Sequence, residues 1–499
     1  MGFYEMAKGI TDSEKVFTDN GAVAYRTSGK EILDFNFDVS AMRGMSEQEI
    51  MDKFCKVYYE NKEVAILYLF YLGDIRGGLG ERHAFRSCMK FLCLEQPNVA
   101  LEVLSLIPYY NRWDSLFDLL EIPVFKNEVL GEIKLQLEED IRKASRGENI
   151  SLLAKWLPSI NTSSAKSRKL AKIICEDIDW SEKKYRKVIS RLRKHLDVVE
   201  CKMSANQWGD IKYESVPSRA NLIYKKAFLR HDPTRRKQYL DALAKGETKI
   251  NASVVNPHEI VFKYHNYWTV GEYDEVLESM WKALPQYGCK NVLVIRDGSG
   301  SMQTMVPKGT TSCLDVATAL AIYTAEHNTG EWKDKFITFS SRPKVVNMKH
   351  CETLRDKISM CYKYTDWDNT NIYKTMKLVL DTAVKNHLKK DEMPEMILII
   401  SDMQFDGMCM GFSNSLFDKI SEEFRYAGYD LPGICFWNVN AVPDKGVPMQ
   451  QNKNGLILCS GFSLGIMNMF LSNKIDPYEV LLDTLYGDRY KPVLDALNQ

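Results

Sequence analysis

The 499-residue chain has no net charge and no long apolar run. Its 66 Lys and Arg residues are matched by 66 Asp and Glu residues, and no segment approaches the roughly 20 apolar residues of a membrane-spanning helix. With 45% apolar and 26% charged residues, the composition is typical of a globular protein and excludes collagen, coiled coil and intrinsic disorder. The first residues also lack the apolar core of a signal peptide. We therefore expect a soluble cytoplasmic protein with no membrane partner.

Cysteine-rich and histidine-rich motifs are also missing. The 12 cysteines include no Cys-x-x-Cys pair, and the eight histidines are dispersed along the chain. No group of these residues has the spacing of a zinc site. We expect the thiols to be reduced and mostly buried, as in other cytosolic proteins.

The zero net charge conceals an uneven distribution. Residues 142–245 carry 25 basic and 11 acidic side chains, a net charge of +14, whereas residues 1–141 carry 15 basic and 24 acidic ones, a net charge of −9. We call residues 142–245 the basic block. Its positive charges repel one another unless a polyanion lies against them, so a nucleic-acid partner is compatible with this sequence.

Up to about residue 285 the hydrophobic pattern is helical. Runs such as VAILYLFYLGDI and NEVLGEIKLQLEEDIRKA have apolar residues at helical spacing, and short breaks contain Gly, Pro or Asn. Successive helix pairs without strands are typical of HEAT-like α-solenoids, although no clean sequence period is present. We predict an all-α domain of HEAT-like helical repeats over residues 1–285.

Within the basic block, the run SEKKYRKVISRLRKHL alternates basic with apolar residues, and few acids are spaced to pair with them. Its outer face is either a solvated helix surface or a phosphate-binding surface. Aromatic residues of the block, among them Trp156 and Tyr224, either pack in the core or stack on bases. The candidate RNA-binding residues are Lys183, Lys184, Arg186, Lys187, Arg191, Arg193, Lys194, Lys225, Lys226, Arg230, Arg235 and Arg236.

After about residue 286, buried strands alternate with helices. KNVLVIRD, DKFITFS and EMILIISD are apolar, β-branched runs, and DVATALAIYTAEHN and NIYKTMKLVLDTAVKN have helical spacing. This alternation predicts a doubly wound α/β domain over residues 286–499. Ligands of such a sheet bind at the carboxyl ends of its strands.

Oxygen-bearing side chains occur at those predicted strand ends. The letters DGSGS at residues 297–301 follow the first strand and offer one carboxylate and two hydroxyls on a tight loop. Hard oxygen ligands suit Mg²⁺, with Mn²⁺ or Ca²⁺ as alternatives. The competing interpretation is a loop without metal, in which Asp297 caps the next helix. The predicted metal ligands are Asp297, Ser299, Ser301, Thr370 and Asp402.

This set resembles the metal-ion-dependent adhesion site of the von Willebrand factor A fold, and the similarity spans about residues 288–475. The resemblance implies a Rossmann-like domain whose metal keeps one position open for an acidic group of a partner. Two features depart from the commonest pattern: Gly298 stands where a bulkier apolar residue often follows the Asp, and Met403 stands where Gly usually follows Asp402. No general base or nucleophile is spaced around the site, so we predict that it binds and does not catalyse.

The segments DIRGGLGERHAFRSCMKFL, LIPYYNRWDSLFDLL, AKWLPSINT and LCSGFSLGIMNMFL resemble a family known only as domain of unknown function 2828, over nearly the whole chain. IPYYNRWDSLFDLL, AKWLPS and the general layout are also similar to the Ro autoantigen (TROVE) proteins, whose helical repeats close into a ring that binds RNA. The resemblance implies an RNA-binding ring whose two ends are joined by an A-type domain.

The loop RGGLGER at residues 76–82 follows a helix and lacks the lysine of a phosphate-binding P-loop, so we predict a turn between two helices. Its arginines and Arg86 are expected either to pair with Asp74 and Glu81 or to point into the ring lumen.

Two functions follow from these predictions. The first is a non-enzymatic, Ro-like RNA-binding scaffold, which binds structured RNA or single-stranded ends with its helices and a divalent metal with its A-type domain. The alternative is a protein-interaction adaptor, whose metal captures an acidic residue of a partner. A metal-dependent nuclease is less favoured, because the site has too few carboxylates for two metals.

Overall fold

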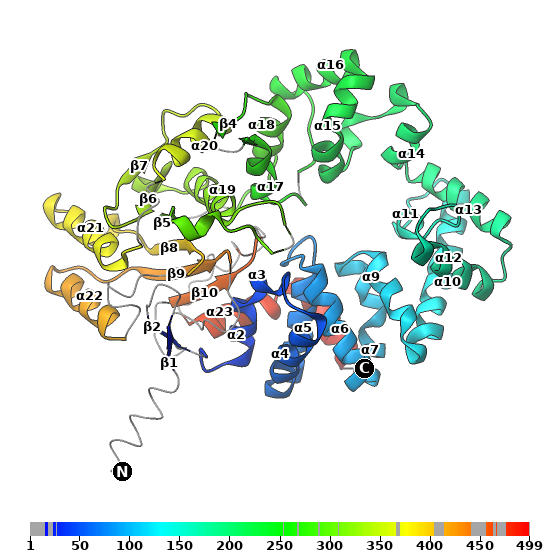
Figure 1. The fold of residues 1–499 in the computed structure, drawn as a ribbon, viewed down its shortest axis with the longest axis horizontal. Helices are drawn as coiled ribbons and strands as arrows, with labels where there is room; N and C mark the ends of the chain where they lie inside the picture. The colour runs from blue at the N-terminus through cyan, green and yellow to red at the C-terminus, as the bar shows by residue number, and fades with distance from the viewer. Residues whose placement is uncertain are drawn as a thin grey trace, which may run out of the picture. The chain divides into compact units, whose positions relative to one another are not determined.

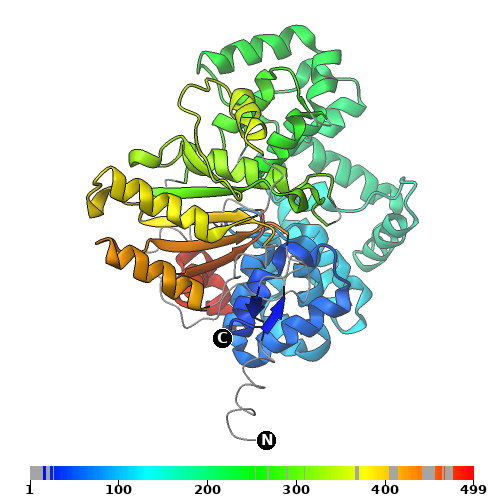
Figure 2. The same cartoon turned by 60° about the vertical axis from the view of Figure 1, so that its left-hand side comes forward.

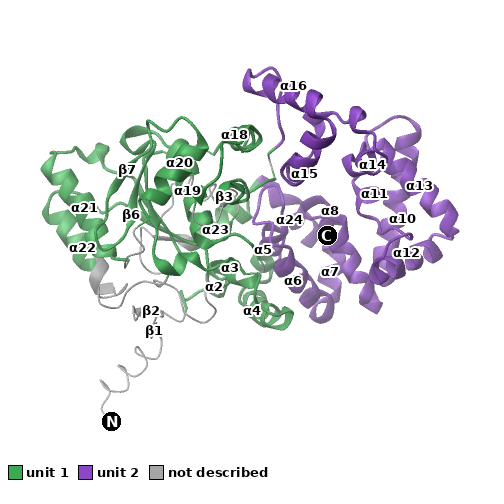
Figure 3. Cartoon of the chain, turned by 45° about the horizontal axis from the view of Figure 1, so that its top comes forward, with its two compact units in different colours: residues 1–65, 252–487 green, residues 66–251, 488–499 purple. Residues whose placement is uncertain are grey.

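The computed structural model describes residues 15–17, 23–25, 27–252, 254–266, 269–287, 290–307, 309–365, 370–403, 414–440, 456–462, 466 and 476–498. The chain forms two compact units (Figure 3). The sheet unit comprises residues 1–65 and 252–487, and the helical unit comprises residues 66–251 and 488–499. No helix in the described ranges is long and apolar enough to cross a membrane.

Six strands of the described chain form the central sheet of the sheet unit (Figure 1). They are β5 (Val292–Asp297), β6 (Lys335–Phe339), β7 (Val345–Asn347), β8 (Met396–Ser401), β9 (Gly433–Asn438) and β10 (Leu456–Ser460). Their order is β10-β9-β8-β5-β6-β7, and only β7 runs antiparallel to its neighbour. The chain thus winds outward from β5 in one direction and then from β8 in the other. This is the predicted doubly wound α/β fold, and its switch point lies between β5 and β8.

Helices cover both faces of this sheet. α19 (Cys313–Glu326) packs against β5 on one face, and α17 (Pro257–Val261) and α20 (Leu354–Lys363) pack against α19. α21 (Ile372–Lys385) and α22 (Asn414–Tyr426) lie side by side on the other face (Figure 2). Alternate side chains of β5 serve the two faces: Leu293 and Ile295 join the core under α21 and α22, whereas Arg296 reaches Thr318 of α19.

The sheet unit also contains three N-terminal helices that the sequence pattern had assigned to the helical domain. They are α2 (Glu31–Phe37), α3 (Val39–Met42) and α4 (Glu47–Glu60), and α2 packs against β10. The backbone N–H of Ser40 donates to Ser460 Oγ at 3.1 Å, and Ser460 Oγ donates to Ser40 Oγ at 2.9 Å. These bonds attach the start of the chain to the end of the last strand. The sheet unit also contains two small antiparallel pairs, β1 (Lys15–Phe17) with β2 (Val23–Tyr25) and β3 (His265–Asn266) with β4 (Thr269–Val270), and the α-helices α18 (Glu275–Lys282) and α23 (Pro477–Leu485).

The described residues of the helical unit contain no strand. The all-α prediction for residues 1–285 is wrong at its two ends, where the short pairs β1–β2 and β3–β4 belong to the sheet unit. Their helices are α5 (Lys62–Gly73, which begins in the sheet unit), α6 (Arg82–Glu95), α7 (Pro97–Val103), α8 (Ile107–Tyr110), α9 (Trp113–Phe117), α10 (Pro123–Ser145), α11 (Leu153–Trp156), α12 (Ala165–Asp177), α13 (Glu182–His195), α14 (Val199–Ser204), α15 (Ser218–His231), α16 (Pro233–Ala244) and α24 (Lys491–Leu497). In α13 the buried residues Tyr185, Ile189 and Leu192 recur at helical spacing, because only one face meets the other helices. HEAT-type repetition and ring closure stay predictions.

A buried ion pair attaches the last residues to the helical unit. The carboxylate of Asp74 is fully buried; it accepts two bonds from the Arg489 guanidinium and one from the Tyr490 hydroxyl at 3.1 Å. A Cβ atom at Gly77 would overlap Arg489, so the first glycine of the RGGLGER loop makes room for this contact. Of the two alternatives for the loop arginine residues, side-chain pairing with Asp74 is therefore not the one observed, since Arg489, more than 400 positions away, takes that place.

We expect Arg489→Ala to destabilise the protein by about 3–5 kcal/mol, because it leaves Asp74 buried without its cation. Urea unfolding followed by circular dichroism measures this loss. The matched control is Arg142→Ala, which removes an exposed ion pair with Glu139 on α10 and should cost far less, because water screens such a pair. Equal losses in the two variants would contradict the role assigned to Arg489.

Candidate functional site

The DGSGS loop begins at the carboxyl end of β5. Asp297 is the last residue of that strand and is fully buried. Its Oδ1 accepts a bond from the backbone N–H of Ser299 at 2.8 Å, and its Oδ2 accepts one from the Ser401 hydroxyl at 2.5 Å. The hydroxyl oxygens of Ser299 and Ser301 lie 3.0 Å apart. The loop therefore gathers one carboxylate and two hydroxyls on the rim of the sheet.

Asp402 lies on the neighbouring strand end. β8 pairs with β5 in parallel, and Asp402 follows its last residue with only 2% of its surface exposed. Burial raises the pKa of the Cys313 thiol, and the charges of Asp402 and Asp297 raise it further. Both carboxylates thus lie near the first turn of α19. The structure brings these two predicted ligands to one edge, at the switch point.

Thr370 belongs to the same edge. It precedes Asn371, whose side chain caps the N-terminus of α21, and Lys374 in the first turn of that helix donates to the carbonyl of Ser341 just beyond β6. Thr370 is 3% exposed, and its hydroxyl has no hydrogen-bond partner among the described residues. A buried hydroxyl without a partner is unfavourable. Within the part of the chain that the structure describes, the Thr370 oxygen is therefore a buried predicted ligand without a hydrogen-bond partner.

Burial raises the pKa of Asp297 above its usual value. The hydrogen bonds from Ser401 and Ser299 and the charge of Arg296 oppose this effect without cancelling it. Arg296 itself is 1% exposed and donates to Thr365 Oγ1 at 2.9 Å and to the carbonyl of Cys361 at 3.0 Å. It thereby holds the end of α20 against β5, next to the DGSGS loop.

The donor set fits a hard divalent cation, since it consists of oxygens only. Among the described residues no three Cys, His, Asp or Glu side chains are grouped as a metal cluster. Among the described residues, the predicted ligands of the candidate site thus comprise two carboxylates and three hydroxyls.

Sequence reasoning missed several polar residues of the same rim. Ser401 holds Asp297, and its own oxygen also accepts a bond from the backbone N–H of Met403 at 3.0 Å. Other parallel strands also end in buried polar residues, namely Ser340 beyond β6, Asn438 of β9 and Ser460 of β10. The signal was available, because the apolar runs of β6, β8, β9 and β10 are followed by or end in a Ser or Asn.

The predicted RNA-binding residues of α13 lie mostly on its outer surface. Lys183, Lys184, Arg186, Lys187, Arg191 and Lys194 are exposed, as are Lys226 and Arg230 on α15, while Lys225 is half-buried. Arg193 points inward: its guanidinium donates to the carbonyls of Ala154 and Leu157 and to Ser159 Oγ at 2.7–3.0 Å. This side chain fastens α13 to the AKWLPS segment.

Two further predicted contacts have structural roles. Arg235 is half-buried and donates to the carbonyls of Trp208, Gly209 and Ile211. Arg236 is fully buried; it donates to Asn221 Oδ1 at 3.3 Å and its guanidinium packs among the rings of Tyr213, Phe228 and Tyr239. The prediction that Arg236 contacts RNA is therefore wrong for this conformation, because no ligand on the surface can reach it.

A groove of about 1170 Å³ lies within the basic block. Its basic lining residues are Lys155, Arg193, Lys194, Lys202 and Arg219, and its acidic ones are Asp197, Glu200 and Asp210. Trp156 and Tyr224, both half-buried, also line it. The groove thus combines a surplus of cations with two accessible aromatic rings, which is the combination that binds single-stranded nucleic acid.

Residues 128–287 match the family described as Domain of unknown function (DUF2828), and residues 291–484 match Domain of unknown function (DUF7788). The chain is also 30% identical, over 518 aligned residues, to an uncharacterized protein of Acanthamoeba polyphaga mimivirus; the match covers 96% of this chain and 88% of the viral protein. The chain belongs to the DUF2828 family. The two matched segments of this DUF2828 protein meet near the predicted domain boundary at residues 285/286. The compact units divide the chain at other positions, because each is formed by two separate stretches of sequence. The domain boundary therefore stays a prediction.

A crystal structure of the Deinococcus radiodurans Ro (RSR) protein also matches the DUF2828 protein, with a TM-score of 0.37 and 14% identity over 81% of this chain and 91% of that chain. A TM-score this low carries no argument about function.

We expect Asp297→Asn to stabilise the DUF2828 protein in EDTA at neutral pH. Because the folded pKa of Asp297 is raised above 3.8, the carboxyl group stabilises the fold below that pH, and this contribution is lost as the pH rises through the folded pKa. The gain should be about 1.4 kcal/mol for each pH unit between the two pKa values. Urea unfolding of both proteins between pH 4 and pH 8 measures it. The matched control Asp430→Asn removes an exposed carboxylate of the same unit and should not give this stabilisation. An Asp297→Asn variant less stable than the wild type at pH 7 would contradict the expectation.

Proposed function

We propose that this protein is a non-enzymatic, Ro-like RNA-binding scaffold, in which the basic block of the helical unit binds single-stranded RNA and the sheet unit binds a divalent metal. The observation that carries the RNA proposal is the groove of the basic block, where cations and aromatic rings line one cavity. The similarity of IPYYNRWDSLFDLL and AKWLPS to the Ro proteins supports it.

The charges next to the groove favour a polyanion. Six Lys and Arg residues of α13 are exposed, and the helix contains a single acidic residue, Glu182, at its first position. Lys194 belongs both to this surface and to the groove lining, so the two are continuous. Phosphates on α13 would release counterions, which makes binding favourable and salt-dependent.

The groove itself favours single strands. Arg193 forms part of its lining and is held by three acceptors of the AKWLPS segment, so that part of the lining is fixed before a ligand arrives. The rings of Trp156 and Tyr224 offer stacking surfaces that an RNA duplex, with its bases already stacked, cannot use.

We expect the double substitution Lys187→Glu/Arg191→Glu to weaken binding of a single-stranded RNA by about tenfold or more at 0.1 M salt, because two phosphate contacts are lost. Each lost contact should also lower the slope of log affinity against log salt concentration by about 0.7. Filter binding at graded salt measures both quantities. The matched control is Lys126→Glu/Lys134→Glu, which reverses two exposed charges on α10, outside the basic block.

Equal losses in the two variants would show that only net charge matters, and absence of RNA binding by the wild type at low salt would refute the proposal. RNA should also remain intact during incubation with Mg²⁺. Cleavage that disappears in Asp297→Asn would replace the scaffold with a metal-dependent nuclease.

For the sheet unit we propose that Asp297, Ser299, Ser301, Thr370 and Asp402 hold the divalent cation, with Mg²⁺ as the first candidate. The buried Thr370 hydroxyl supports this, because a metal would satisfy an oxygen that no described residue bonds. The small number of carboxylates in this set, Asp297 and Asp402, favours the adaptor as a second candidate function. A cation held by so few protein charges would retain affinity for an acidic side chain of another protein.

We expect Mg²⁺ at a hundredfold excess over its dissociation constant to stabilise the wild type by about 2.7 kcal/mol. Thermal unfolding with and without EDTA measures this, and Mn²⁺ and Ca²⁺ are compared in the same way. Asp297→Asn and Asp402→Asn should each abolish the effect, whereas the exposed control Asp430→Asn should retain it. A wild-type melting temperature indifferent to all three ions would refute the metal proposal.

A further inference from the structure

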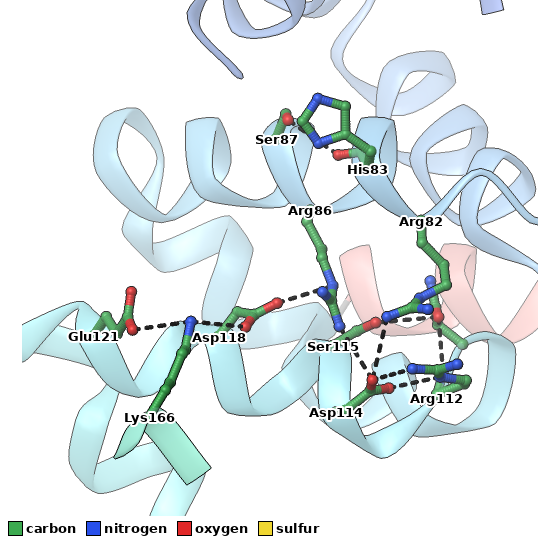
Figure 4. Close-up of polar contacts among 11 residues, drawn as sticks. Arg82, His83, Arg86, Ser87, Arg112, Asp114, Ser115, Asp118, Glu121 and Lys166 are labelled. Atoms are coloured by element: carbon green, nitrogen blue, oxygen red, sulfur yellow. Dashed lines mark hydrogen bonds and ion pairs between the residues drawn. The ribbon is translucent and has the colours of Figure 1, made fainter. Parts of the chain in front are cut away.

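Three arginine side chains converge on one carboxylate in the helical unit (Figure 4). Arg82 and Arg86 lie one turn apart on α6, Arg112 precedes α9, and Asp114 is in the first turn of α9. We call Arg82, Arg86 and Arg112 the arginine cluster. It lies outside the basic block, in the segment whose net charge is negative.

The arginine cluster has more guanidinium groups than carboxylates in contact with them. Asp114 Oδ2 lies 3.2 Å from Arg82 Nη2 and 3.4 Å from Arg86 Nη2, and Asp114 Oδ1 accepts a bond from Arg112 Nε at 2.7 Å. Arg86 Nε also reaches Asp118 at 2.9 Å. Three guanidinium groups thus share one carboxylate fully and a second one in part.

The neighbouring charges do not remove this surplus. Lys166 of α12 lies 3.9 Å from Asp118 and 3.2 Å from Glu121. Its positive charge therefore neutralises the negative charge of Glu121, and Lys166 also shares Asp118 with Arg86. The three arginine side chains are between 21% and 37% exposed. Their repulsion is therefore only partly screened by water, and burial together with the charge of Arg112 lowers the pKa of Arg82.

The cluster also retains donors for a ligand. Three guanidinium groups carry about fifteen N–H donors, and Asp114 and Asp118 occupy only some of them. Arg82 Nε is buried and makes no hydrogen bond within the described residues. Because Asp114 draws all three groups toward one point, their positions are set before an anion binds.

We propose that the arginine cluster is a binding site for a phosphate dianion, such as a phosphomonoester. Planar guanidinium forks match the oxygens of phosphate in pairs. With Asp114 and Asp118 both counted, the three arginine side chains keep a surplus of one positive charge. A phosphomonoester carries close to two negative charges at neutral pH, so these side chains attract it more strongly than a singly charged anion. An internal phosphodiester carries only one negative charge.

The site adjoins the groove described above. The guanidinium of Arg112 stacks on the ring of Trp156 at 3.8 Å, and Trp156 lines that groove. A phosphate on the cluster is therefore either the terminal phosphate of a strand in the groove or a free phosphate. The proposal goes beyond the RNA-binding function and does not depend on it, because inorganic phosphate tests it without RNA.

The test is calorimetric titration of the full chain with inorganic phosphate at constant ionic strength. We expect saturable binding at one site, weakened about tenfold or more by Arg82→Gln or Arg86→Gln. The matched control Arg142→Gln removes another α-helical arginine that is paired with an acid and should leave binding unchanged. Tryptophan fluorescence should respond to phosphate in the wild type and lose that response in Trp156→Phe, which retains the binding heat.

Two oligonucleotides of one sequence, one with a 5′-phosphate and one with a 5′-hydroxyl, show whether the bound phosphate is the end of a strand or a free phosphate. If the phosphorylated strand binds more tightly and loses this advantage in Arg86→Gln, the cluster binds strand ends. If the two strands bind alike while inorganic phosphate binds, the ligand is a free phosphate. Absence of saturable phosphate binding by the wild type, or binding that both glutamine variants retain, overturns the proposal. Loss of RNA binding in the basic-block variant leaves this result untouched.

Discussion

A buried carboxylate must find donors, and this constraint organises both units of the protein. In the helical unit Asp74 is fully buried and takes its donors from Arg489 and Tyr490. In the sheet unit Asp297 is fully buried and takes its donors from Ser299 and Ser401. The desolvation penalty of an ionised carboxylate amounts to several kcal/mol. Each of these contacts therefore holds its surroundings in one arrangement.

The two carboxylates differ in how well they are compensated. Asp74 has a guanidinium as its partner, and the pair is charge-neutral. Asp297 receives hydrogen bonds from a hydroxyl and a backbone N–H, but burial still raises its pKa. A structural carboxylate is stable without a ligand, whereas a carboxylate left short of positive charge is suited to hold a cation. This difference separates the anchor of the chain terminus from the candidate metal site.

Burial and available partners also distinguish the basic side chains that can bind an anion from those that cannot. Arg236 is fully buried among aromatic rings, so it adds to the positive count of the block but not to its surface. Arg193 lines the groove, but its guanidinium already donates to the AKWLPS segment. Lys187 and Arg191 lie outside and meet solvent. In the arginine cluster, partly buried cations outnumber the carboxylates that face them. The position of a charge, not the number of charges, decides where an anion can bind.

The sequence by itself determined the secondary structure classes and the strand-end oxygens. Strand runs such as KNVLVIRD read as parallel because they are apolar on both faces, and DGSGS follows from the rule that ligands bind at the carboxyl ends of such strands. Local periodicity also predicted the exposed face of α13.

What only the tertiary structure decided are contacts between residues far apart in the chain: the pairing of Asp74 with Arg489, the inward turn of Arg236, the attachment of Ser40 to Ser460, and the meeting of Arg82, Arg86 and Arg112 at Asp114. Local patterns report which side of a helix or strand is buried, but they hold no information on which distant group fills the space beside it. A partner for a buried charge is chosen by the packing of the whole unit, and it becomes visible only when the chain is folded.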